Sequence, residues 1–260
     1  MNEFVKLGSK VYTAPSGIEY NLEPGVVYNL EFDDWHRESF LTIGEPLKIP
    51  SKIYKKKEDE KFIEKILNNF KEEDSNTTGV LLTGLKGSGK TVLAKTLATQ
   101  SNVPIIVVTS NYPTRYLDNF FTKFSKTEIC VIFDEIDKNQ DKWDTEDLLG
   151  FLDGTNGTSK KLVIFTCNKC KDVNEYLLDR CSRIRYRKIY KSLSEEDIRQ
   201  FVNFLLDNKD RTKEITKFVV ENIKTLSYDN VQSFVCECMR YPEDSLKDLL
   251  KDMNINNEAL

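Results

Sequence analysis

One stretch of the sequence combines the residue types that bind phosphate. Gly84-Leu85-Lys86-Gly87-Ser88-Gly89-Lys90-Thr91 has the spacing G-x-x-x-x-G-K-T. It lies between a β-prone apolar run at residues 80–83 and a helix-forming segment at residues 92–98. At such a junction, backbone N–H groups at a helix N-terminus face an anion, and glycines let the backbone curl round it. We therefore predict that the loop binds phosphates, with Lys90 reaching the β/γ-phosphates and the Thr91 hydroxyl facing Mg²⁺.

Two acids and an amide follow two further predicted strands. Asp134 and Glu135 end the apolar run at residues 129–133, and Asn168 follows the run at residues 162–166. Ligands bind at the carboxyl edge of parallel strands, so these side chains are expected to face the phosphates. Asp134 would hold Mg²⁺ through water, Glu135 would polarise the attacking water as general base, and Asn168 would contact the γ-phosphate or orient the water. A surface Asp-Glu pair and a turn-forming Asn are the structural alternatives.

Two arginines, Arg180 and Arg183, follow a short predicted helix at residues 172–178. An arginine that faces a neighbouring subunit can stabilise transition-state charge in trans. The alternative is a solvated basic surface, because Arg185, Arg187 and Lys188 lie close by in the sequence. The spacing alone does not decide between the two.

The pattern of apolar segments predicts an α/β fold with three parts. Residues 1–50 alternate short β-prone runs with Pro and Gly turns, which predicts a small β-rich unit. Residues 51–190 alternate strands and helices, which predicts a parallel five-stranded sheet. Residues 191–260 contain no further strand pattern and predict an α-helical domain. The predicted strands of the sheet lie at residues 80–83, 103–109, 129–133, 162–166 and 184–189, and the predicted C-terminal helices at 198–206, 211–223, 228–239 and 243–251.

Composition excludes several other classes of protein. The 260 residues carry a net charge of −4, so nothing in the charge indicates nucleic-acid binding, although it stays open. No apolar run is long enough to span a bilayer, and six cysteines without a secretory signal predict a reduced, cytoplasmic location. A single histidine, His36, excludes a Ser-His-Asp triad, and Cys167 and Cys170 lack the second pair that a zinc site needs.

The order of these motifs resembles that of AAA+ ATPases over about residues 45–245. The segment from Leu148 to Gly154 is similar to the classical AAA branch, and the segment from Leu226 to Gln232 distantly resembles the mitochondrial Rieske-protein translocase group. The resemblance implies Walker A at 84–91, Walker B at Asp134-Glu135, sensor 1 at Asn168 and arginine fingers at Arg180 and Arg183. It further implies a homo-oligomeric ring of six or seven subunits that binds ATP and Mg²⁺ between subunits.

The sequence departs from the family's pattern at several places. Leu85-Lys86 replaces the usual Pro-Pro of the phosphate loop, Cys181-Ser182 replaces the usual Pro-Gly between the arginines, and no arginine clearly fills a sensor-2 position. The membrane helix of the translocase group is absent from the sequence. That group's specific function therefore does not transfer.

Three aromatic residues are candidates for gripping a substrate in the pore of a ring. Tyr112 is the better candidate on the loop after the second strand and Tyr116 the second, while Trp143 follows the acidic pair. The alternatives are a core-capping role for Tyr116 and a partner contact for Trp143.

The sequence thus predicts an ATP-hydrolysing AAA+ ring that remodels or translocates a macromolecule, with protein as the expected substrate. Residues 1–50 would bind the substrate or an adaptor, and no membrane partner is expected. One alternative is a clamp-loader or helicase-loader type switch on DNA replication assemblies. Another is an ATP-gated assembly module whose rings or filaments are themselves the function.

Overall fold

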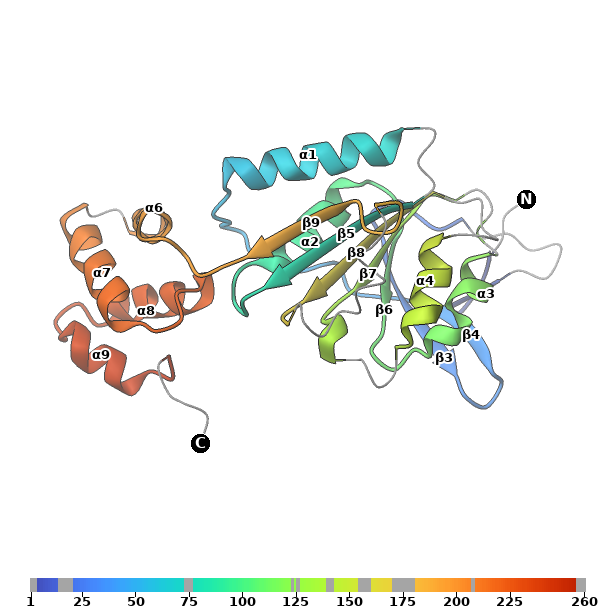
Figure 1. The fold of residues 1–260 in the computed structure, drawn as a ribbon. Helices are drawn as coiled ribbons and strands as arrows, with labels where there is room; N and C mark the ends of the chain where they lie inside the picture. The colour runs from blue at the N-terminus through green and yellow to red at the C-terminus, as the bar shows by residue number, and fades with distance from the viewer. Residues whose placement is uncertain are drawn as a thin grey trace. The chain divides into compact units, whose positions relative to one another are not determined.

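A computed structural model describes residues 4–13, 21–72, 77–122, 124, 127–138, 143–153, 160–169, 181–206 and 209–255. The chain forms two compact units (Figure 1). The sheet unit comprises residues 1–51, 55–83 and 91–189, and the lid unit comprises residues 52–54, 84–90 and 190–260. The phosphate loop thus groups with the C-terminal helices, although chain connectivity places it between a strand and a helix of the sheet unit.

The strands of the described chain join in one sheet with the order β1-β2-β4-β3-β6-β7-β8-β5-β9. Neighbouring strands β6, β7, β8 and β5 are parallel, as the alternation of strands and helices predicted. The α/β phosphate-loop fold is therefore confirmed, but the sheet is larger than the five predicted strands. Its strands are β1 (Phe4–Leu7), β2 (Lys10–Thr13), β3 (Val27–Asp33), β4 (Glu38–Ile43), β5 (Thr77–Gly84), β6 (Ile105–Val108), β7 (Ile129–Phe133), β8 (Lys161–Cys167) and β9 (Tyr186–Tyr190).

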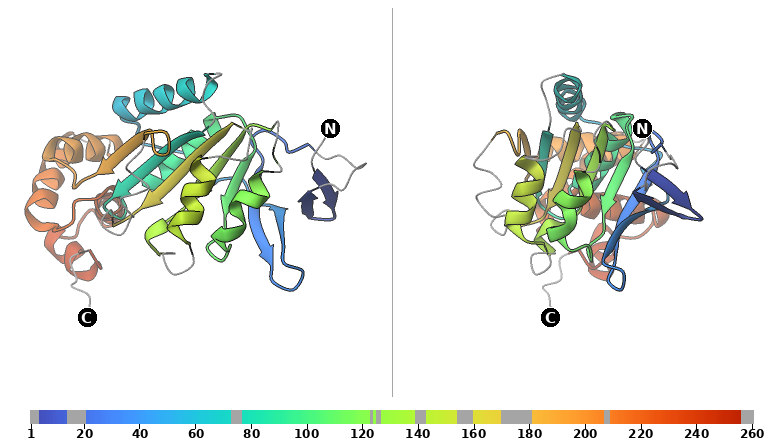
Figure 2. Two further views of the ribbon diagram at one scale, coloured as in Figure 1. Left: turned by 45° about the vertical axis from the view of Figure 1, so that its right-hand side comes forward. Right: turned by 90° about the vertical axis from the view of Figure 1, so that its right-hand side faces the viewer.

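The β-rich N-terminal segment continues this sheet. Strand β3 pairs in parallel with β6, from Val27 opposite Ile105 to Leu30 opposite Val108. Tyr28 and Leu30 are fully buried in the same core as the central strands. Residues 1–51 accordingly fall within the sheet unit, and Figure 2 shows β3 and β4 beside the other strands. An adaptor role for these residues stays a prediction.

One face of the sheet carries a core rich in aromatic side chains. Phe133 of β7 is opposite Phe165 of β8 in the parallel pair, so both side chains point to this face and their rings stack. The face is covered by short helices, and Phe151 packs against Phe133. These helices are η1 (Thr114–Tyr116), α3 (Leu117–Phe121) and α4 (Thr145–Asp153), with η2 (Ile136–Lys138) immediately after β7. Phe151 of α4 thus packs against the last residue of β7, directly before Asp134.

Helices α1 and α2 also belong to the sheet unit. Helix α1 (Lys57–Lys71) lies beside β9, where the ring of Phe62 meets Tyr186 edge to face and the Lys188 ammonium pairs with Asp59. Helix α2 (Lys90–Gln100) follows the phosphate loop and buries Ala94, Leu97 and Ala98. None of the described helices is long and apolar enough to cross a membrane.

The described residues of the lid unit form four helices round a core of their own. They are α6 (Glu195–Leu205), α7 (Lys209–Asn222), α8 (Tyr228–Arg240) and α9 (Leu246–Asp252), close to the predicted ranges. Serine N-caps start three of them: Ser194, Ser227 and Ser245 each accept a hydrogen bond from a backbone N–H of the first turn. The buried face of α8, with Val231, Phe234 and Val235, belongs to this core. The predicted helical lid is thus present.

Candidate nucleotide-binding and hydrolysis site

The phosphate loop has the backbone that its glycines predict. Gly84, Gly87 and Gly89 have φ angles of +120°, +69° and +92°, in the region where a Cβ is strained. Gly84 also allows a close approach, because a Cβ there would lie 2.0 Å from the carbonyl oxygen of Tyr190. The Leu85 N–H donates to that same oxygen at 3.1 Å. The start of the loop therefore tolerates only glycine.

Lys90 is held within the loop that it serves. Its side chain is buried, and its ammonium donates to the carbonyl oxygens of Gly84 at 2.8 Å and Leu85 at 2.7 Å. These bonds curl the loop back on its own lysine. The charge of Lys90 is consequently placed inside the turn of backbone rather than out in solvent.

The loop has the features that a phosphate requires. The Ser88 hydroxyl is buried and has no hydrogen-bond partner among the described residues. A buried hydroxyl without a partner is costly, and a phosphate oxygen would accept a hydrogen bond from it. With the positive-φ glycines on either side and Lys90 beneath, the residues of the loop fit a nucleotide phosphate.

A threonine that the sequence reasoning missed ties the two acids to the next strand. Thr166 of β8 is almost fully buried, and its Oγ1 donates to Oδ1 of Asp134 at 2.5 Å. Oγ1 of Thr166 also accepts a hydrogen bond from the backbone N–H of Glu135 at 2.8 Å. Its signal in the sequence was a polar residue inside an otherwise apolar strand, two positions before Asn168.

Both oxygens of the Glu135 carboxylate have donors. The Asn168 amide donates to Oε1 at 3.1 Å, and the Lys138 ammonium contacts Oε2 at 2.5 Å. These partners lower the pKa of Glu135, with Lys138 the larger cause. The Asn168 N–H in turn donates to Asp137 at 3.0 Å. Asn168 therefore contacts the predicted general base directly, and Lys138 is a second partner that the sequence motifs do not indicate.

The backbone of Glu135 has a conformation that is unusual for a residue with a side chain. Its φ is +51°, a conformation that costs free energy and persists only where surrounding bonds enforce it. The hydrogen bond from its N–H to Thr166 is one such bond. The carboxylate of Glu135 is thus aimed by the strand end and not by its own backbone preference.

The oxygen donors near the strand ends suit Mg²⁺. Asp134 presents an exposed carboxylate, and Mg²⁺ takes one or two carboxylates with water and phosphate oxygens. Asp134 together with the Thr91 hydroxyl is the donor set that such an ion would use. Among the described residues, no three His, Cys, Asp or Glu side chains form a metal cluster, so an all-protein cage is not the alternative there.

Of the two arginines predicted as trans fingers, the structure describes only Arg183. Arg180 lies outside the described residues, as does the short helix predicted before it. Arg183 forms a two-pronged ion pair with Asp153 at the end of α4, with Nε to Oδ1 at 2.7 Å and Nη2 to Oδ2 at 2.6 Å. The roles of Arg180 and Arg183 as trans fingers stay predictions. Arg183 would have to exchange its ion pair with Asp153 for a contact with the neighbour's triphosphate.

The structure does not support a gripping role for Tyr112 or Trp143. Tyr112 is 0% exposed and its hydroxyl shares a hydrogen bond with Ser39 at 2.8 Å, while Trp143 is 4% exposed and packs edge to face on Phe133. A side chain that grips a substrate must reach the surface, and burial in the aromatic core prevents this. Tyr116 is partly buried and stacks on Phe32, so its ring has a structural role whatever else it does.

Comparison with known proteins agrees with this site. Residues 80–189 match the model of the ATPase family associated with various cellular activities (AAA). The match covers both the phosphate loop and the acidic pair, and it supports an AAA+ ATPase that binds ATP. It spans less than half of the chain, and no curated protein matches. Nothing in these comparisons supports the likeness to the Rieske-protein translocase group.

Proposed function

We propose that this protein hydrolyses ATP, with the phosphate loop holding the triphosphate and Glu135 acting as general base. One observation carries the proposal: Thr166, Asn168 and Lys138 together hold the carboxylates of Asp134 and Glu135 at the end of β7, beside the end of the parallel strand β8. Asp134 would hold Mg²⁺, which neutralises charge on the phosphates. Glu135 would take a proton from water, and Asn168 would keep the carboxylate turned toward it.

The proposal extends to a ring in which neighbouring subunits complete each site. Arg180 would reach the triphosphate of the next subunit, and Arg183 is the second candidate. AAA domains commonly form rings, which supports this arrangement. The number of subunits is proposed as six or seven, in line with the resemblance, and the compartment as the cytoplasm.

The ring is proposed to do mechanical work on a macromolecule, with protein as the expected substrate. Residues 1–50 would make the contact with a substrate or adaptor. Support comes from the turn between β3 and β4, where Trp35 is 95% exposed. Asp33 fixes this turn by accepting the N–H groups of Trp35 at 2.9 Å and His36 at 3.2 Å. A rigid turn that presents an indole to solvent suits a partner contact.

The test is a comparison of Glu135→Gln with Glu128→Gln in ATPase assays. Glu128 lies just before β7, at the opposite end of the strand that Glu135 follows, and is exposed. Loss of the general base is expected to lower turnover by roughly 10²- to 10⁴-fold, whereas Glu128→Gln should leave it unchanged. Equal activity in both variants would overturn the assignment of Glu135.

The same Glu135→Gln variant, loaded with ATP, separates the proposed work from its rivals. It should retain a bound protein substrate in a pull-down, because the ATP state persists. Stimulation of the wild-type ATPase by DNA rather than by unfolded protein would favour the loader-type switch. Full biological activity of Glu135→Gln without turnover would favour the ATP-gated assembly module.

A further inference from the structure

The first turn of α8 packs directly against the phosphate loop within the lid unit. The backbone N–H of Asp229 donates to the carbonyl oxygen of Gly87 at 3.0 Å. A Cβ added to Gly87 would lie 2.6 Å from Cβ of Asp229 and 3.1 Å from Oγ of Ser227. The middle glycine of the loop is therefore needed for a second reason besides its φ angle, since α8 occupies the space that a side chain would fill.

The residue that makes this contact carries a negative charge. The carboxyl carbon of Asp229 would lie 3.6 Å from the same added Cβ, so the carboxylate is next to the loop. It is exposed, and it has no hydrogen bond or ion pair with any residue that the structure describes. A loop whose N–H groups and lysine are arranged for an anion thus has an unneutralised carboxylate beside its middle glycine.

A carboxylate at this place opposes the binding of phosphate. Like charges a few ångströms apart repel, and the repulsion grows with the charge of the ligand. ATP carries one more negative charge than ADP at neutral pH. The repulsion should accordingly weaken ATP binding more than ADP binding.

We propose that Asp229 determines the nucleotide preference of the loop by weakening ATP relative to ADP. The inference rests on the proposed function, because it assumes that the loop binds these nucleotides.

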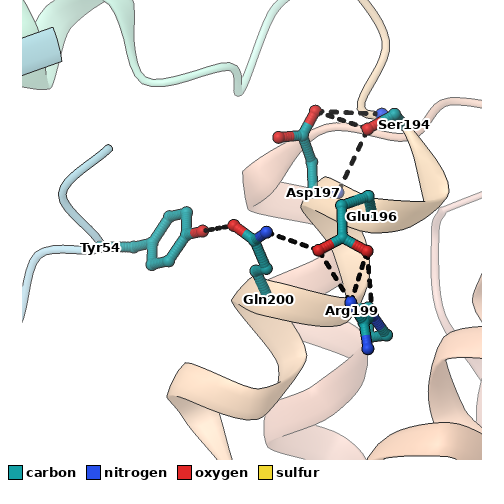
Figure 3. Close-up of polar contacts among 6 residues, drawn as sticks. All are labelled: Tyr54, Ser194, Glu196, Asp197, Arg199 and Gln200. Carbon is teal, nitrogen blue, oxygen red and sulfur yellow. Dashed lines mark hydrogen bonds and ion pairs between the residues drawn. The ribbon is translucent and has the colours of Figure 1, made fainter. Parts of the chain in front are cut away.

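If Asp229 served only to stabilise its helix, its removal would change ATP and ADP binding equally or not at all. An acid in the first turn of a helix stabilises the helix by interacting with its dipole. Glu196 of α6 occupies the equivalent position, two residues after its serine N-cap, as Asp229 does after Ser227. Figure 3 shows that the Glu196 carboxylate is paired, since it accepts from Arg199 at 2.6 Å and from Gln200 at 2.6 Å. Glu196 is thus a matched acid without the proposed role.

The experiment measures ATP and ADP binding by calorimetry in the full-length Glu135→Gln background, which keeps ATP intact during titration. Adding Asp229→Asn should tighten ATP binding by about three- to tenfold and ADP binding by less than about twofold, and the difference should shrink at high salt. Adding Glu196→Gln should change neither affinity. Thermal melting without nucleotide checks that each variant is folded, and Asp229→Ser serves as a second substitution.

Two results would overturn the inference about Asp229 without refuting the proposed nucleotide site. Asp229→Asn could leave both affinities unchanged, or it could shift ATP and ADP equally, as loss of a structural contact would. Absence of ATP and ADP binding in the parent Glu135→Gln protein would instead refute the proposed nucleotide site, and the inference with it.

Discussion

The hydroxyl of Thr166 is the part of the site whose removal gives the clearest prediction. Thr166→Val keeps the shape and the β-branched side chain but loses the oxygen that joins Asp134 to the Glu135 N–H. Residue 166 is 1% exposed, so water cannot easily replace the hydroxyl on the strand side. The variant therefore leaves the Glu135 N–H without its partner while preserving the packing of β8.

The expected cost follows from the two hydrogen bonds. A bond between neutral groups contributes about 0.5–1.5 kcal/mol and one to a charged group about 1.5–3 kcal/mol. Asp134 is exposed and water can solvate it, which reduces its share, so the free energy of unfolding should fall by about 1–3 kcal/mol. Glu135 has a φ of +51° and loses a bond that enforces it. If the activation free energy of hydrolysis rises by about 1.4–2.8 kcal/mol of this amount, turnover falls about 10- to 100-fold.

The measurement pairs steady-state ATPase assays with thermal melting of the wild type, Thr166→Val and Thr166→Ser. Serine retains the hydroxyl and should retain most of the turnover, although it loses a methyl group from the core. Should Thr166→Val melt earlier yet hydrolyse ATP at the wild-type rate, the hydroxyl would be structural only. The argument that it positions the acids would then be wrong.

Two further predictions concern stability. Gly79→Ala should lower the melting temperature sharply, because the new Cβ would lie 1.8 Å from the carbonyl oxygen of Arg183. Gly150→Ala places a Cβ in a helix with nothing within 4 Å, and it should raise the free energy of unfolding by about 0.5–1 kcal/mol. The opposite order of melting temperatures would contradict the packing beside β5. Burial raises the pKa of Tyr112 to about 12 from 10.0. Tyr112→Phe removes the hydrogen bond with Ser39, so the free energy of unfolding should fall by about 1 kcal/mol at neutral pH. The raised pKa contributes stability below pH 10 that the wild type loses as the pH rises from 10 to 12. The free energy of unfolding of Tyr112→Phe, measured by denaturant titration, should therefore decline less over that interval.

The sequence predicted those parts of the molecule in which local pattern and geometry coincide. The phosphate loop is contiguous, and its glycines are needed at the positions where the structure has positive φ angles. The acidic pair and Asn168 end apolar strands, and parallel pairing of β7 with β8 brings those ends together. In each case a short stretch of residues was sufficient, because the relevant geometry follows from one strand and its end.

Features that depend on distant contacts were not predictable in this way. Tyr112 is adjacent to polar loop residues in the sequence, but its hydroxyl meets Ser39 at the start of β4, and its ring meets Phe32 at the end of β3. No local pattern announces that the N-terminal strands extend the sheet and cover this tyrosine. The same holds for Trp143, whose indole is buried against Phe133.

The arginine pair shows where sequence spacing cannot separate two roles. Arg183 already has a carboxylate in a two-pronged geometry, and its side chain is only 11% exposed. A guanidinium that stabilises a neighbour's triphosphate in trans would first have to leave Asp153, at the cost of a charged hydrogen-bond pair. Arg183 thus fixes the end of α4 to the segment that leads into β9, and a trans role for it requires this ion pair to break. A trans role for Arg180 stays a prediction.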